Sequence, residues 1–187
     1  MAFPGNRPYL PPAMRTPIAI ALILLSGCNR PATSPDPNGL VSVRWTGAVQ
    51  GQLAAIGAGR WCAADSLLEV VAVDSITDHA VGFSLLMQDS LRPGQHPIVA
   101  GSVAANWRPL GFAAFRWASD TALKGYEATG GTITVSAATP ASVSGTVDLR
   151  LRLSQGIDTV NLTGSFTTVP ILPASAPCGR LVKIRQG

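Results

Sequence analysis

The stretch VSGTVDLRLRL, residues 143–153, decides the fold. Its apolar side chains stand on one face of an extended chain and its polar ones on the other. The apolar face holds Val143, Val147, Leu149, Leu151 and Leu153; the polar face holds Ser144, Thr146, Asp148, Arg150 and Arg152. Because successive side chains of a strand point to opposite faces, this alternation predicts a strand between a hydrophobic core and water.

The same period of two recurs from Leu40 onward, with turn-forming residues between the apolar runs. It is present in residues 40–46, 81–87, 132–136 and 160–167. We therefore predict an all-β domain over residues 40–187, either an antiparallel β-sandwich or a small open barrel.

Two stretches depart from this pattern. Residues 66–74, SLLEVVAVD, are apolar enough for a strand that is buried on both faces. Residues 51–64 are the one place where a short helix could form, although their glycines argue against a long one.

Composition excludes several classes of protein. Hydrophobic residues make up 47% of the 187 residues and charged residues 13%, a balance that argues against disorder. Without the two arginines that precede Cys28, the net charge falls from +4 to +2, and the basic residues are spread along the chain. We therefore predict no nucleic-acid partner.

The N-terminus has the layout of a secretory signal. Arg15 precedes the apolar run IAIALILL, residues 18–25, which is far shorter than the roughly 20 residues of a membrane-spanning helix. The run ends in Leu25-Ser26-Gly27-Cys28, which resembles the lipobox of bacterial lipoproteins. This resemblance implies that residues 1–27 are a signal peptide, that cleavage separates Gly27 from Cys28, and that the Cys28 thiol carries lipid. Met14 is an alternative translation start.

The resemblance also implies an address. The membrane partner would be lipid, reached through acylated Cys28, and two or three acyl chains would hold the protein stably in the cell envelope. Asn29 after the cysteine favours the outer membrane. Residues 28–39 are rich in Pro, Ser, Thr and Asn and lack an apolar period, so they form a flexible tether.

Short motifs in the second half are similar to those of uncharacterised bacterial envelope lipoproteins. They are LRPGQHPI (91–98), GGTITV (130–135), VSGTVDL (143–149) and LTGSFTTV (162–169). Val147 stands where Phe is commoner in that set. The resemblance implies the β fold and the envelope location but no catalytic residues, and it leaves a protein or glycan partner unknown.

Cys62 and Cys178 remain once Cys28 carries lipid. Two cysteines in an oxidising compartment predict a disulfide. The bond would enclose 115 residues and contribute about 4.7 kcal/mol in the chain-entropy model. The alternative is a redox or metal pair, for which only His79 and His96 could add ligands. No C-x-x-C is present, and we predict neither a metal nor a cofactor.

Candidate catalytic groups are few. No zinc-protease, nucleophile-elbow or phosphate-loop motif is present. Asp78-His79 is the one acid–imidazole neighbour pair, and we expect both His79 and His96 to lie in solvated loops.

The tryptophans offer a different kind of site. Trp45 and Trp117 follow the apolar period and predict core positions, and we expect Trp61 to pack on the disulfide. Trp107, with Arg108 beside it, has loop neighbours and is the candidate ligand contact.

Three functions follow from these patterns. The favoured one is a non-enzymatic binding or structural module anchored in the envelope. The second is a lipoprotein that binds carbohydrate or another small ligand through Trp107 and Arg108. The third, ranked well behind, is a hydrolase with an unrecognised site near Asp74, Asp78 and His79.

Overall fold

A computed structural model describes residues 39–87, 90–98 and 110–172. These residues form nine strands, one 3-10 turn and no α-helix. The strands are β1 (Leu40–Gly47), β2 (Gly51–Cys62), β3 (Leu67–Val73), β4 (Ala80–Leu86), β5 (Gly94–Pro97), β6 (Leu110–Ser119), β7 (Ala122–Ala138), β8 (Ser142–Leu153) and β9 (Thr159–Leu172), and the turn is η1 (Ala63–Asp65).

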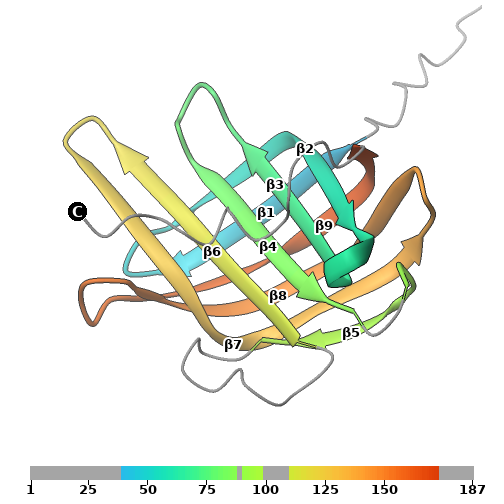
Figure 1. Cartoon of the computed structure of the whole chain (residues 1–187). Helices are drawn as coiled ribbons and strands as arrows, with labels where there is room; N and C mark the ends of the chain where they lie inside the picture. Colours follow the sequence, from blue (N-terminus) through green and yellow to red (C-terminus); the bar gives the residue numbers. More distant parts are fainter. Residues whose placement is uncertain (1–38, 88–89, 99–109, 173–187) are drawn as a thin grey trace, which may run out of the picture. The chain divides into compact units, whose positions relative to one another are not determined.

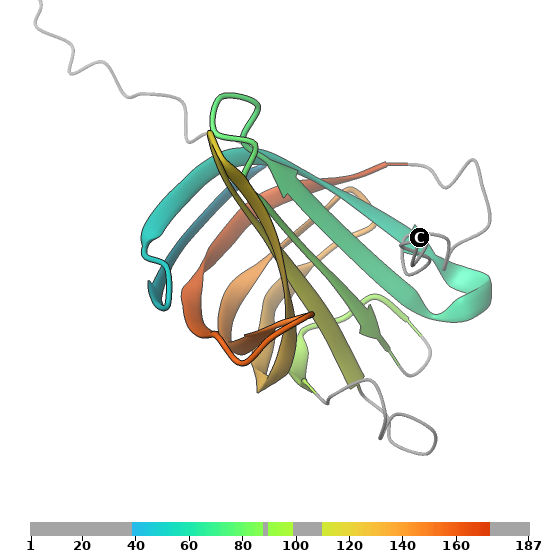
Figure 2. The same cartoon turned by 90° about the vertical axis from the view of Figure 1, so that its left-hand side faces the viewer.

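All nine strands belong to one sheet, in the order β5-β7-β6-β4-β3-β2-β1-β9-β8 (Figure 1). Neighbouring strands are antiparallel, apart from a short parallel pairing of β2 with β9. Because β7 also pairs with β8, eight strands form a ring, and the short β5 adds to the free edge of β7. The turned view shows the sheet curling on itself (Figure 2). The predicted all-β, antiparallel class is confirmed, and the sandwich and the open barrel are both consistent with this sheet.

The stretch that predicted the fold forms β8 as expected. Its apolar residues are buried and its polar residues exposed in strict alternation from Val147 to Arg152. The short helix considered for residues 51–64 does not form: β2 extends to Cys62, and only the η1 turn follows. Gly57 and Gly59 face inward, where a Cβ would meet Val41 Cγ2 at 2.7 Å and Ile171 Cδ1 at 2.8 Å. These glycines therefore keep the strand period while they make room for neighbouring side chains.

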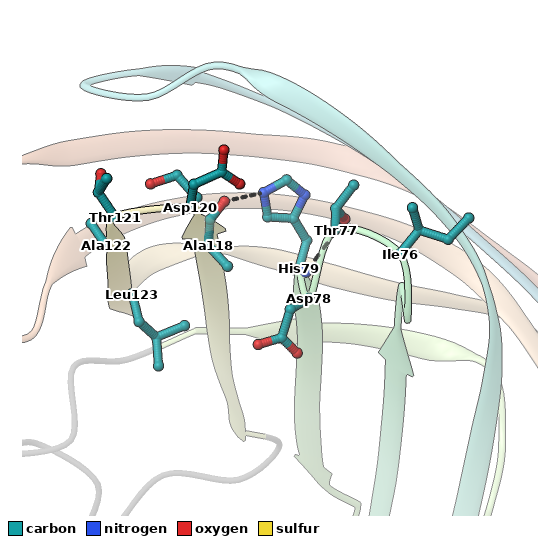
Figure 3. Close-up of a pocket in the computed structure, with 10 residues that line it drawn as sticks. Ile76, Thr77, Asp78, His79, Ala118, Asp120, Thr121, Ala122 and Leu123 are labelled. Atoms are coloured by element: carbon teal, nitrogen blue, oxygen red, sulfur yellow. Dashed lines mark hydrogen bonds between the residues drawn. The ribbon is translucent and has the colours of Figure 1, made fainter.

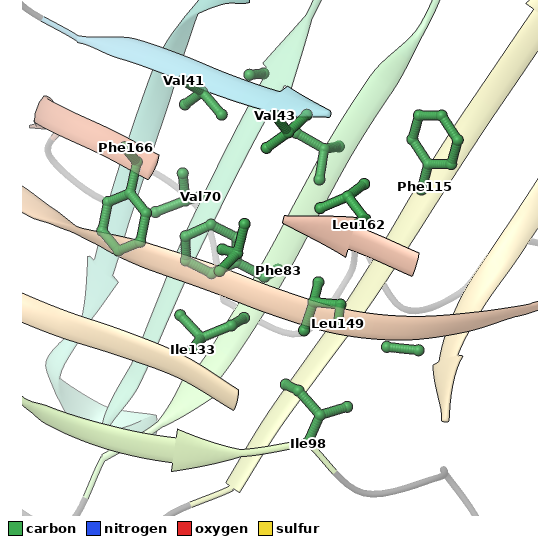
Figure 4. Packing of buried hydrophobic residues seen from close by; sticks show 14 of the residues in the cluster. Val41, Val43, Val70, Phe83, Ile98, Phe115, Ile133, Leu149, Leu162 and Phe166 are labelled. Atoms are coloured by element: carbon green, nitrogen blue, oxygen red, sulfur yellow. The ribbon is translucent and has the colours of Figure 1, made fainter. Parts of the chain in front are cut away.

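The inside of the sheet is filled by one hydrophobic cluster (Figure 4). Its largest fully buried members are Trp45, Tyr126, Phe115 and Phe166. Phe83 and Phe166 meet across it with ring centroids 5.1 Å apart. Each fully buried side chain of this size contributes roughly 1.5–3 kcal/mol by leaving water, so the interior rather than the surface ion pairs supplies most of the stability.

The sequential strand order gives the domain two different ends. The connections β1–β2, β3–β4, β6–β7 and β8–β9 meet at one end, which we call the hairpin end. The start of β1 at Leu40 and the last described residue of β9, Leu172, lie at the other end, which we call the tether end. The chain therefore joins the domain at the end opposite the four hairpins.

Candidate functional site

A shallow depression of about 650 Å³ lies at the hairpin end, between the β3–β4 and β6–β7 turns (Figure 3). Residues 76–79 line one side and residues 118–123 the other. Hydroxyl and carboxylate groups mix there with the exposed apolar side chains of Ile76 and Leu123. The depression combines polar groups with apolar surface, as ligand sites do, although it is open rather than enclosed.

The β3–β4 side of the depression is shaped by Asp74. Its carboxylate accepts hydrogen bonds from Ile76 N at 2.9 Å and Thr77 Oγ1 at 2.7 Å, and its own N–H donates to His79 O at 2.9 Å. The Thr77 hydroxyl and the Ile76 N–H stabilise the charged form and lower the pKa of Asp74. This carboxylate therefore fixes the turn.

Asp78 is tied to the neighbouring hairpin. Arg116 Nε donates to the Asp78 carbonyl oxygen at 3.1 Å, and Arg116 Nη2 donates to Asp78 Oδ1 at 2.5 Å. Both side chains are largely exposed, at 41% for Arg116 and 62% for Asp78, so the pair contributes little stability. Its effect is to hold β4 and β6 together beside the depression.

His79 turns away from Asp78 and packs against the core. Its Nε2 lies 3.1 Å from Ala118 O, and because a carbonyl only accepts, this nitrogen carries the proton. The ring meets Trp45 edge-on at a centroid distance of 5.0 Å and lies 6.4 Å from the Trp117 ring. His79 therefore lies in the predicted loop between β3 and β4, but its ring is half-buried against aromatic side chains, so the expectation of a solvated side chain is wrong.

Several buried polar atoms beneath the depression lack a hydrogen-bond partner among the described residues. They are Trp45 Nε1, His79 Nδ1 and Tyr126 Oη. Their rings belong to one aromatic cluster, in which Phe115 lies 4.6 Å from Trp45 and 5.9 Å from Tyr126. Desolvation raises the pKa of Tyr126, which keeps its hydroxyl protonated. The aromatic cluster beneath the depression therefore buries three polar atoms that no described residue bonds.

His96 is also placed differently from the prediction. It lies in β5, pairs with Ile133 of β7 and is only 4% exposed, with neither ring nitrogen bonded within the described chain. Burial lowers the pKa of His96 below its usual 6.5. The solvated-loop expectation is wrong because His96 and Ile98 continue the strand period through the flanking prolines.

The remaining site predictions have mixed outcomes. Trp45 is buried as expected, whereas Trp117 and Trp61 are half-buried and pack against the core. Cys62 ends β2 and is 5% exposed. Gly27, Cys28, Trp107, Arg108 and Cys178 lie outside the described residues, so cleavage, lipidation, the ligand contact and the disulfide stay predictions.

The outer surface of the sheet carries a second contrast. On β7, β8, β9 and β1 the outward side chains are mostly polar and form cross-strand rows. One row is Thr134, Thr146, Ser165 and Ser42, and the next is Thr132, Asp148, Thr163 and Arg44. We call this surface the hydroxyl face.

The outward side chains of β2, β3, β4 and β6 are mostly apolar, and we call them the apolar face. It consists of Ala58, Cys62, Leu67, Val71, Gly82, Leu86, Phe112 and Ala114, around an ion pair of Arg60 with Glu69. Sequence reasoning missed this ion pair. Its only signal is that Glu69 is the single charged residue within the apolar run 67–73.

Within the described ranges, no three His, Cys, Asp or Glu side chains come together as a metal site. No helix there is long and apolar enough to cross a membrane. Comparisons of the chain with known protein families, with curated proteins and with solved structures found no match.

Proposed function

We propose that the protein is a lipid-anchored envelope module that works by binding a partner at its hairpin end and catalyses no reaction. The observation that carries this proposal is the division of the domain into two ends. The tether joins the domain at the end opposite the hairpins, where β1 starts. The hairpin end has the depression and three exposed apolar side chains, those of Ile76, Leu123 and Ile157.

The state of the candidate catalytic groups supports a binding role. The Asp78 carboxylate is engaged by Arg116, the His79 ring donates to Ala118 O, and the Asp74 carboxylate fixes its own turn. A general base needs a free lone pair that can reach a substrate proton, and the ring nitrogen of His79 that does not contact Ala118, Nδ1, is buried beneath the depression. The interior is filled by side chains, so a ligand would bind on the surface rather than inside the sheet.

Lipidation is tested first. The precursor is expressed in a bacterium with labelled palmitate, and Cys28→Ser is compared with the unaltered chain. We expect labelling and a mature N-terminus at residue 28 for the unaltered chain, and an unlabelled, uncleaved precursor for Cys28→Ser. Equal labelling of both would contradict the anchor.

The absence of catalysis is tested with esterase, peptidase and glycosidase substrates. We expect no turnover above that of His79→Ala and His96→Ala variants whose circular dichroism shows an intact fold. Turnover that disappears in either variant would promote the hydrolase hypothesis.

A small polar ligand such as a carbohydrate is the second candidate. It is favoured by the convergence of Ser119, Asp120 and Thr121 on one side of the depression. A glycan array is the direct measurement, with Asp120→Ala as the site variant and Asp148→Ala on the hydroxyl face as the control. Binding that is lost only in Asp120→Ala would place the ligand in the depression.

A further inference from the structure

The centre of the apolar face is more deeply buried than an outer sheet surface should be. Glu69 points away from the core, yet only 2% of it is exposed, and Cys62 on the same face is 5% exposed. On the hydroxyl face the corresponding outward residues, such as Asp148 and Thr163, are exposed. The centre of the apolar face, at Glu69 and Cys62, is therefore less exposed to solvent than these residues of the hydroxyl face.

Glu69 also has unused bonding capacity. Its Oε2 accepts from Arg60 Nε at 2.9 Å and from Arg60 Nη2. Its Oε1 is buried and accepts no hydrogen bond from any described residue. A buried carboxylate oxygen without a donor costs free energy, so a second donor on this face would be stabilising.

The chain itself leads onto this surface. Cross-strand pairing places Leu172, Arg60, Glu69, Ser84 and Phe112 in one outward row across β9, β2, β3, β4 and β6. Leu172 is the last described residue, and fifteen residues follow it. The chain therefore leaves β9 at the edge of the apolar face, beside Arg60.

The composition of residues 173–187, PASAPCGRLVKIRQG, suits this face. The apolar side chains of Leu181, Val182 and Ile184 alternate with or adjoin the cations Arg180, Lys183 and Arg185, and the segment has no acid. From β2 to β6 the face spans three strand spacings, roughly 14 Å, and fifteen extended residues can reach about 50 Å. The segment is therefore long enough to cross the face, has apolar side chains to cover it, and has cationic donors for Glu69 Oε1.

We propose that the apolar face is the docking site of the chain's own C-terminal segment, residues 173–187. Leu181, Val182 and Ile184 cover the apolar side chains of the face, and Arg180 or Lys183 donates to Glu69 Oε1. The predicted bond between Cys62 and Cys178 would fasten the same segment to the same face, but the apolar and charged contacts hold it independently.

The test uses the whole mature chain with a photo-crosslinking phenylalanine analogue in place of Phe112, a half-buried position at the end of the row. The control carries the analogue in place of Thr163 on the hydroxyl face. After irradiation, mass spectrometry identifies the crosslinked peptides. We expect residues 173–187 to be crosslinked from position 112 and not from position 163.

If something other than residues 173–187 occupies the apolar face, position 112 will form a different crosslinked product. A crosslinked dimer would assign the face to a second copy of the chain, and a crosslink to lipid or to a different segment would assign it elsewhere; each result overturns the proposal. The experiment is repeated in Cys178→Ser. A persisting crosslink supports docking by apolar and charged contacts, whereas its loss overturns that part of the proposal.

The contact with Glu69 is tested by a double-mutant cycle on urea unfolding. Glu69→Gln is combined with Arg180→Gln plus Lys183→Gln, and the control cycle pairs Asp148→Asn with the same changes. We expect the Glu69 cycle to show coupling of at least about threefold in the unfolding equilibrium constant and the control cycle to show none. Equal coupling in both cycles, or none in either, would overturn the contact.

Discussion

On β7, β8, β9 and β1 the side chains that point away from the core are mostly Thr, Ser, Asn, Asp and Arg, whereas on β2, β3, β4 and β6 they are mostly Ala, Val, Leu and Phe. Both faces belong to the same sheet and enclose the same hydrophobic cluster. A strand in which inward apolar residues alternate with polar ones therefore has its outer face in water. A strand in which they alternate with small or apolar residues has an outer face suited to packing against a further part of the protein. The hydroxyl face suits contact with water, whereas the apolar face suits the C-terminal docking segment proposed above.

The largest expected effect comes from removing the predicted link between the apolar face and the C-terminus. Cys178→Ser should lower the free energy of unfolding by about 2–5 kcal/mol under oxidising conditions, because the unfolded chain regains the entropy of a long open loop. Urea unfolding with and without reductant measures this loss. The control is Cys28→Ser, which should leave unfolding unchanged. Equal stability of Cys178→Ser and the unaltered chain would rule out the bond.

The ion pair of the apolar face should be worth far more than its counterpart at the hairpin end. Arg60→Ala leaves the buried Glu69 carboxylate without its partner, and we expect a loss of about 3 kcal/mol. Arg116→Ala removes the partner of the exposed Asp78, and we expect less than about 1 kcal/mol. Chemical denaturation of both variants gives the two values. Similar losses would show that Glu69 meets water after all.

A pair of neighbouring glycines tests the hydroxyl side, where β7 bends. Gly131 has φ +114°, and a Cβ there would collide with the backbone carbonyl oxygen of Asp148. Gly130 has open space at the same point. Gly131→Ala should therefore cost about 2 kcal/mol and Gly130→Ala less than about 0.5 kcal/mol. Thermal and urea unfolding of the two variants provide the measurement, and equal effects would contradict the bend.

Glu69 and His96 are both buried polar residues, but Glu69 has an ion-pair partner, whereas the ring of His96 has no hydrogen-bond partner among the described residues. Burial lowers the pKa of His96 in the folded state, so between that value and about 6.5 the unfolded chain binds more protons. Stability should therefore fall as the pH drops below about 6.5, by at most about 1.4 kcal/mol per pH unit. His96→Leu should remove this slope. An unchanged slope between pH 7 and pH 5 would mean that another group causes it.

Sequence reasoning reached the strands because their signal is local. The pattern from Val143 to Leu153 needs no knowledge of its neighbours, and β8 forms where it predicts. The burial of the two histidine rings was missed because their surroundings are not local: His79 is held by Ala118 of β6, and His96 is buried against β7. The sequence singled out Asp78 and His79 on one side of the depression but not residues 118–123 on the other, because that side comes from a different hairpin.

Glu69 shows an intermediate case. The run 66–74 predicted a strand buried on both faces, and Glu69 on the outward face is indeed buried. Nothing in that run names Arg60 as its partner, because the pairing depends on the register of β2 with β3. Burial could thus be predicted from composition, whereas the ion pair required the sheet.

The ring has consequences for how the chain acquires its structure. Most neighbouring strands follow one another in sequence, so their pairing needs only short loops to close. The seam between β1 and β9 is different: Trp45 pairs with Leu162, and the two are separated by most of the domain. During synthesis the N-terminus is made first, so one edge of β1 stays unpaired until β9 has been made. An unpaired strand edge can form non-native pairs with other strands. The outward side chains of β1, Ser42, Arg44 and Thr46, are polar and keep this strand soluble while its edge is unpaired. The polar rows that face water in the folded domain therefore also protect the first strand before the last one is made.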